Sequence, residues 1–124
     1  MNSQIVLVLG NIANRKLVEV LSGLGFAAQV WGSVQHSLEK IRHQKFTAIL
    51  VDQKFTHADV LEFILNVRDI DKKVPVVVIG NGAEEKITQK IAKQDYTTVL
   101  SEVESNDKLT NELGQVLNTL SKNN

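Results

Sequence analysis

Five short apolar runs recur along the chain at fairly even spacing, and a stretch with helical periodicity follows each of them. The first, third and fourth runs are continuously apolar, which is typical of strands covered on both faces in a parallel sheet. The expected strands are IVLVL (5–9), AAQVW (27–31), TAILV (47–51), VPVVVIG (74–80) and TTVL (97–100).

Amphipathic helices are predicted after these runs, because apolar residues three and four positions apart form one stripe in each stretch. The fourth stripe is thin, and Ser105 or Asn106 is the expected N-cap of the fifth helix. Right-handed crossovers then place helices on both faces of the sheet. The prediction is an α/β fold, (βα)5, with a doubly wound, five-stranded parallel sheet. The stripes are Leu17, Val20, Leu21 and Leu24; Val34, Leu38 and Ile41; Val60, Leu61, Ile64 and Val67; Ile87 and Ile91; and Leu109, Leu113, Val116, Leu117 and Leu120.

Length and composition exclude several classes of protein. A chain of 124 residues fits one domain, and 14 basic residues balance 14 acidic ones. A neutral chain has no global attraction to nucleic acid or anionic membrane, so neither is an expected partner. The absence of cysteine excludes disulfides, thiol catalysis and thiolate metal sites. The N-terminus has no basic segment before its short apolar run, and a cytoplasmic domain is therefore predicted.

In doubly wound sheets, ligands and chemistry lie beyond the carboxyl ends of the strands. Asp52 is the only acid at the expected strand ends, so it is the centre of the candidate site. The residues at these ends are Leu9-Gly10-Asn11, Asp52-Gln53-Lys54, Gly80-Asn81-Gly82 and Val99-Leu100-Ser101.

Glycine-rich strand ends also allow a different class of function. Gly10-Asn11 and Gly80-Asn81-Gly82 could cradle an anion with backbone N–H groups, which makes a small-ligand-binding regulatory domain an alternative. The full Gly-x-Gly-x-x-Gly pattern is absent after the first strand, and turn formation explains these glycines equally well. Trp31 ends the second strand at a sheet edge, where core packing is the expectation.

Four stretches carry a resemblance to a known family. They are VLVLGNIANRKLVEVLSGLGF, LEKIRHQKFTAILVDQKF, VPVVVIGNGAEE and DYTTVL. Together they resemble the receiver domain of two-component signalling proteins, most closely the receivers fused to hybrid histidine kinases, over essentially the whole chain. The resemblance implies the flavodoxin-like receiver topology with strand order 2-1-3-4-5. It also places Asp52 on the phosphoacceptor aspartate and Tyr96 on the aromatic residue of the switch and interface.

The departures from the family fall on its catalytic positions. The two metal-binding acids correspond to Leu9 and Gly10, the Thr or Ser after strand four corresponds to Gly80, and the Lys of Lys-Pro corresponds to Val99. Magnesium ions are typically held by one or two carboxylates besides substrate oxygens, and here Asp52 alone would remain. Positioning and electrostatics are almost the whole of phosphoryl-transfer catalysis. Efficient transfer is therefore not expected.

The resulting prediction is a degenerate receiver, or pseudo-receiver, that is not an enzyme and has no catalytic residues, metal site or cofactor. Asp52 is a vestigial phosphoacceptor, and its expected neighbours include Lys54, whose ammonium is hypothesised to pair with the Asp52 carboxylate. The other expected neighbours of Asp52 are Gly10, Asn11, Gly80 and Val99.

The predicted function is two-component signalling through protein–protein contacts. By resemblance, the partners are histidine kinase or response-regulator domains, in cis or in trans. The candidate surface is the fourth helix, fifth strand and fifth helix (86–92, 96–100 and 108–120), which also offers a homodimer contact. Residues 1–124 are expected to form one receiver-like domain, compatible with excision from a longer signalling protein. The alternative is a phosphorelay receiver that accepts phosphate at Asp52 and then requires Mg²⁺.

Overall fold

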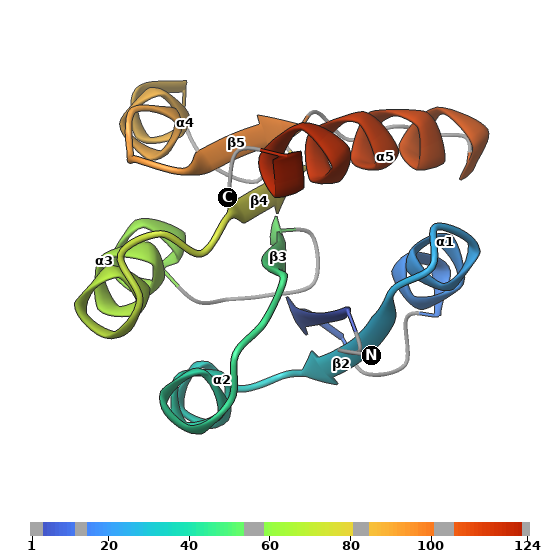
Figure 1. Cartoon of the computed structure of the whole chain (residues 1–124). Helices are drawn as coiled ribbons and strands as arrows, with labels where there is room; N and C mark the ends of the chain where they lie inside the picture. Colours follow the sequence, from blue (N-terminus) through green and yellow to red (C-terminus); the bar gives the residue numbers. More distant parts are fainter. Residues whose placement is uncertain (1–3, 12–14, 54–58, 81–84, 101–105, 123–124) are drawn as a thin grey trace.

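The computed structural model describes residues 4–11, 15–53, 59–80, 85–100 and 106–122, the last range by its backbone alone at 106 and 119–122. Five strands and five helices alternate along the chain, as the spacing of the apolar runs predicts (Figure 1). The elements are β1 (Ile5–Leu9), α1 (Lys16–Gly23), β2 (Ala27–Trp31), α2 (Val34–His43), β3 (Ala48–Asp52), α3 (Val60–Ile70), β4 (Val76–Ile79), α4 (Glu85–Ala92), β5 (Thr97–Leu100) and α5 (Asn106–Lys122).

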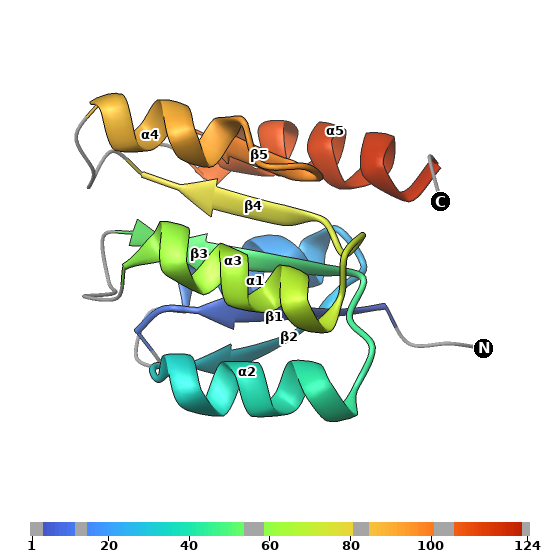
Figure 2. The same cartoon turned by 90° about the vertical axis from the view of Figure 1, so that its left-hand side faces the viewer.

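The five strands form one parallel sheet in the order β2-β1-β3-β4-β5, which confirms the predicted topology. Their arrows run in the same direction in Figure 2, so their carboxyl ends meet at one edge of the molecule. β3 extends to Asp52, one residue further than the apolar run suggests. β4 is shorter than its run and ends before Gly80, whose φ of 111° breaks the extended conformation.

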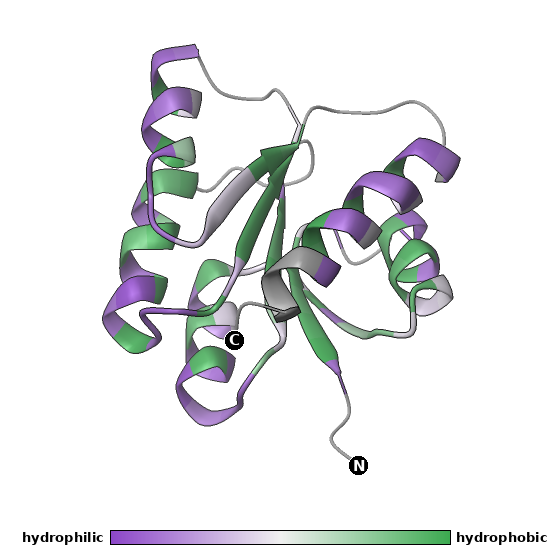
Figure 3. Cartoon of the chain, turned by 45° about the horizontal axis from the view of Figure 1, so that its top comes forward, coloured by the Kyte–Doolittle hydropathy of each residue, from purple (hydrophilic) through white to green (hydrophobic). Residues whose placement is uncertain are grey.

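Two hydrophobic cores lie on the two faces of the sheet. Helices α2, α3 and α4 cover one face, where Phe63 and Ile91 are almost fully buried. Helices α1 and α5 cover the other, where Leu21 and Leu113 are fully buried. Alternate strand residues point into the two cores. Figure 3 shows apolar strands enclosed by helices that carry polar residues.

The central strands are the best buried part of the fold. Every residue of β3 and β4 is buried, whereas the edge strands β2 and β5 are only partly covered. Helix α4 has the thin apolar stripe that the sequence predicts, because Ile91 is buried while Ile87 is 40% exposed. Within the described residues, no helix has both the length and the apolar character needed to cross a bilayer.

Candidate functional site

Asp52 is the last residue of β3, at the carboxyl end of the central strand. It is 7% exposed, and it is the one buried side chain with a charge among the residues that the structure describes. Ala48 and Leu50 of the same strand point into the α1–α5 core. Because strand residues alternate between faces, the side chain of Asp52 lies on this same face. A carboxylate is costly to bury, so its retention here marks the position as a candidate site.

Gly10 lies directly against Asp52. It follows β1 at the position that continues the register of Leu9 with Val51, and its N–H donates to the carbonyl of Trp31 at 3.0 Å. A Cβ atom at position 10 would lie 3.2 Å from the Cβ of Asp52 and 4.0 Å from its Oδ2. Any side chain at this position would therefore crowd the carboxylate, and an acid would place a second negative charge over it.

Substituting Gly10 by alanine is expected to destabilise the fold by about 1 kcal/mol, because the new methyl group meets the backbone-linked Cβ of Asp52. The matched control is Gly23→Ala, where nothing lies within 4 Å of the new Cβ. This control replaces a helical glycine by the best helix former and is expected to be neutral or slightly stabilising. Thermal and denaturant unfolding of the two variants measures the difference, and equal stability of both would contradict the crowding at Gly10.

The apolar neighbours of Asp52 come from β4 and β5. Asp52 pairs with Ile79, and Ile79 pairs with Leu100, so these three residues form one row across the sheet. Ile79 and Leu100 belong to the α1–α5 core, on the same face as Asp52. Val99, the predicted neighbour, packs against the opposite core. The residue of β5 that shares a row and a face with Asp52 is Leu100, and a place for Val99 beside the site stays a prediction.

Leu9 also lies away from the Asp52 carboxylate. It is fully buried in the α2–α4 core, whereas the next residue, Gly10, faces Asp52. Of the two positions that correspond to the family's acids, only position 10 therefore adjoins Asp52 on its own face of the sheet.

Gly80 follows β4 beside this row and has a backbone conformation that favours glycine. Its φ is 111°, and its N–H donates to the carbonyl of Leu100 at 3.0 Å. Residues with a Cβ rarely adopt this conformation. A residue with a Cβ atom at position 80 would therefore be strained in this backbone conformation.

Two of the predicted neighbours follow the same strand ends. Asn11 is exposed and comes directly after Gly10. Lys54 lies outside the described residues, so the proposed pairing between its ammonium and Asp52 stays a prediction.

The topology and the carboxyl-end site can be compared with known proteins. No protein-family model and no curated protein sequence matches the chain. A response regulator receiver domain (CheY-like) from Methanospirillum hungatei superposes with a TM-score of 0.81 at 14% identity, over 100% of both chains. The chain has the receiver fold. A chemotaxis response regulator of Vibrio cholerae matches with a TM-score of 0.74 at 19% identity, over 94% of this chain and 99% of the other.

A third receiver allows a comparison of the metal site. It is the receiver domain of a sensor histidine kinase from Pseudomonas aeruginosa, solved with magnesium coordinated in its active-site cleft (TM-score 0.73, 17% identity, over 94% and 99% of the two chains). Magnesium prefers oxygen ligands in octahedral geometry. In this receiver fold, the described residues in register with Asp52 are Gly10, Ile79 and Leu100, and none has a side-chain oxygen. The side chains of these three residues therefore supply no ligand for magnesium.

Tyr96 lies at the other end of the receiver fold. It immediately precedes β5, four residues before Leu100, which is about 13 Å along an extended strand. Its φ is 56°, its carbonyl accepts from the N–H of Val76 at 2.9 Å, and its side chain is 46% exposed. The structure therefore does not bring Tyr96 and Asp52 together, and a switch role for Tyr96 stays a prediction.

Arg68, which the sequence pattern does not single out, holds this opposite end together. Nη1 donates to the carbonyls of Val74 at 2.7 Å and Asp71 at 3.2 Å. Nη2 donates to the carbonyls of Asp95 at 2.8 Å and Tyr96 at 3.2 Å. Burial lowers the pKa of Arg68, while Asp71 and Asp95 act in the opposite direction. One side chain thus joins the end of α3 to the turn before β5.

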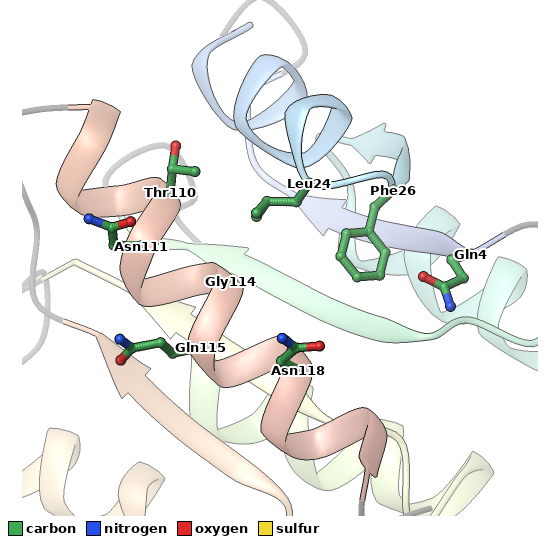
Figure 4. A pocket seen from close by; sticks show the side chains of 8 residues that line it. All are labelled: Gln4, Leu24, Phe26, Thr110, Asn111, Gly114, Gln115 and Asn118. Atoms are coloured by element: carbon green, nitrogen blue, oxygen red, sulfur yellow. The ribbon is translucent and has the colours of Figure 1, made fainter.

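A cavity of about 430 Å³ lies between α1 and α5, beside the amino ends of β1 and β2 (Figure 4). Its lining has no charged residue, and it stands at the end of the sheet opposite Asp52. It is therefore distinct from the predicted crevice at Gly10 and Gly80, where Asn81 and Gly82 lie outside the described residues. The lining residues are Gln4, Leu24, Phe26, Thr110, Asn111, Gly114, Gln115 and Asn118.

Proposed function

We propose that this chain is a pseudo-receiver, which acts in two-component signal transduction through protein–protein contacts and without efficient phosphorylation. The observation that carries the proposal is the environment of Asp52. A glycine lies directly against the carboxylate, and an isoleucine and a leucine continue its row across the sheet. Phosphoryl transfer depends on charges and hydrogen-bond donors placed around the acceptor, and these residues supply no side-chain charge or donor.

The expected loss of catalysis is large. Removing one preorganised stabilising group from a transition state typically costs about 3 kcal/mol, or roughly a hundredfold in rate. Gly10 supplies no carboxylate, Gly80 supplies no hydroxyl, and neither Val99 nor Leu100 supplies an ammonium. Together these residues support a domain that needs no cofactor and is not an enzyme.

The proposed partners are histidine kinase or response-regulator domains, in cis or in trans, in the cytoplasm. The face of α4, β5 and α5 remains the first candidate surface for them. Ile87 is partly exposed there, beside the exposed Lys86 and Lys90 on α4. A small apolar contact surrounded by charged residues suits a transient interface. A homodimer through this same face is the second use that we propose for it.

The alternative is a phosphorelay receiver that accepts phosphate at Asp52. The observation that favours it is the placement of Asp52, since an acid at the carboxyl end of the central strand is retained in spite of its burial. This alternative requires Mg²⁺ and predicts that Asp52 responds to a phosphoryl analogue.

Beryllofluoride with Mg²⁺ separates the two functions. For the full chain, amide chemical shifts are expected to stay unchanged at Asp52 and Gly10 as beryllofluoride is titrated in the presence of Mg²⁺, because Gly10, Ile79 and Leu100 offer no side-chain ligand beside the Asp52 carboxylate. The Asp52→Asn variant is the matched control, since it removes the acceptor oxygen with little change in shape. Saturable, magnesium-dependent shifts in the wild-type chain that the variant lacks would overturn the pseudo-receiver and establish the phosphorelay alternative.

A further inference from the structure

Strand β2 is an edge of the sheet, and its backbone has hydrogen-bonding groups that face away from the molecule. β1 is its one neighbour in the sheet of the described residues. The N–H of Ala27 donates to the carbonyl of Gln4, and the carbonyl of Trp31 accepts from the N–H of Gly10. Ala27, Gln29 and Trp31 therefore bond inward to β1, and by alternation the N–H and C=O groups of Ala28 and Val30 point outward.

This edge lacks the features that usually prevent a strand from pairing with another chain. Proteins protect exposed edges with charged side chains, proline or bulges. Residues 20–35 contain no charged side chain and no proline, although 23% of the whole chain is charged. The other edge strand, β5, is shorter and follows Lys93 and Asp95. The charge nearest to the strand that the described residues show is the ammonium of Lys40 on α2, which lies 5.4 Å from the ring centroid of Trp31, at one end of β2. The middle of the strand, around Gln29, therefore carries no charge of its own against a second copy.

We propose that β2 pairs antiparallel with β2 of a second copy of this chain, with Gln29 on the twofold axis. In this register Ala28 lies opposite Val30 of the second copy, and the two residues exchange N–H···O bonds in both directions. Symmetry repeats the exchange, which gives four backbone bonds from groups that face outward in one copy. Gln29 then faces its own counterpart in a non-hydrogen-bonded pair, where side chains approach most closely.

Side-chain sizes along the strand suit this register. Ala27 lies opposite Trp31 of the second copy, and Phe26 lies opposite Gly32, so each large residue meets a small one. The side-chain carbonyl of Gln29 also lacks a hydrogen-bond donor, because its Oε1 is buried without a partner among the described residues. Its Nε2 donates to Oε1 of Gln44 at 3.4 Å. A rotation of the amide toward the twofold axis gives Oε1 a donor, the Nε2 of the facing Gln29.

The inference does not rest on the proposed function. β2 and β5 are opposite edges of the sheet, so a dimer through β2 leaves the face of α4, β5 and α5 open to a signalling partner. The joined sheet would run continuously through both copies.

Sedimentation velocity of the full chain from micromolar to millimolar concentration tests the dimer. Self-association is expected for the wild-type chain, and it is expected to weaken by at least about tenfold in Gln29→Lys and in Gln29→Glu, because like charges then meet on the axis. An equimolar mixture of the two variants is expected to recover association. The control Leu65→Lys, on the exposed surface of α3 and outside both candidate surfaces, is expected to leave it unchanged. A monomeric wild-type chain, or a mixture that associates no better than each variant, overturns the proposal.

A backbone substitution gives an independent test. Ala28→Pro removes an outward N–H and keeps the inward bonds to β1, so the monomer is expected to fold while association is lost. Circular dichroism checks the fold of each variant. Unchanged association of a folded Ala28→Pro variant would contradict the pairing, as would loss of association in Leu65→Lys alone.

Discussion

Replacing Arg68 by alanine is expected to lower the free energy of unfolding by about 3 kcal/mol. The guanidinium donates to four backbone carbonyls, at 2.7–3.2 Å, and the substitution removes every one of these bonds. Carbonyls that lose a charged donor while partly buried retain the cost of their desolvation. Tyr96 is affected as well, because its left-handed backbone is held by one of these hydrogen bonds. The centroid of its ring also lies 5.9 Å from the guanidinium carbon of Arg68.

Two further variants distinguish the effect of these four hydrogen bonds from a general effect of lost charge. Arg68→Lys keeps the charge but replaces a planar fork by a single ammonium, so it is expected to recover less than half of the loss. Lys72→Ala removes an exposed charge just after α3, next to Asp71, and is expected to change stability by less than about 0.5 kcal/mol. Urea unfolding followed by circular dichroism measures all three. An Arg68→Ala variant as stable as Lys72→Ala would show that the four bonds contribute nothing.

The fold could be predicted from the sequence because its signals are local. The bounds of β1, β2 and β5 match their apolar runs, since a parallel strand that is covered by helices must be apolar along its length. That same property hides which residue of β5 shares a face with Asp52. In the run TTVL, Val99 and Leu100 are both apolar, so the alternation that assigns residues to faces is invisible until the register with β4 is known.

The candidate site could be predicted only in part, for physical reasons that differ from residue to residue. Asp52 is visible in the sequence because a charge ends an apolar run, and Gly10 is visible because it follows one. Arg68 is not visible, because its partners are backbone carbonyls, which every residue carries. The positive φ of Gly80 and its bond to Leu100 are not visible either, because both belong to the backbone path beyond β4.

The second large effect is expected at Gly80, where threonine would restore the residue type of the family's receivers. Gly80→Thr is expected to destabilise the fold by about 2 kcal/mol, because a β-branched residue is strained at a φ of 111°. Relief of this strain would move the N–H that donates to Leu100 and so weaken the end of the β4–β5 ladder.

Comparison of three substitutions at this position separates backbone strain from the effect of the hydroxyl group. Gly80→Ala is expected to lose nearly as much stability as Gly80→Thr, whereas Gly80→Asn is expected to lose less, since asparagine tolerates positive φ better than other residues with a side chain. Urea unfolding measures the stabilities, and beryllofluoride titration with Mg²⁺ measures the site. Because Gly10 still lies against Asp52 and Ile79 still pairs with it, the threonine variant is expected to remain unresponsive. A threonine variant that is both stable and responsive would show that the hydroxyl alone separates this chain from a phosphorylated receiver.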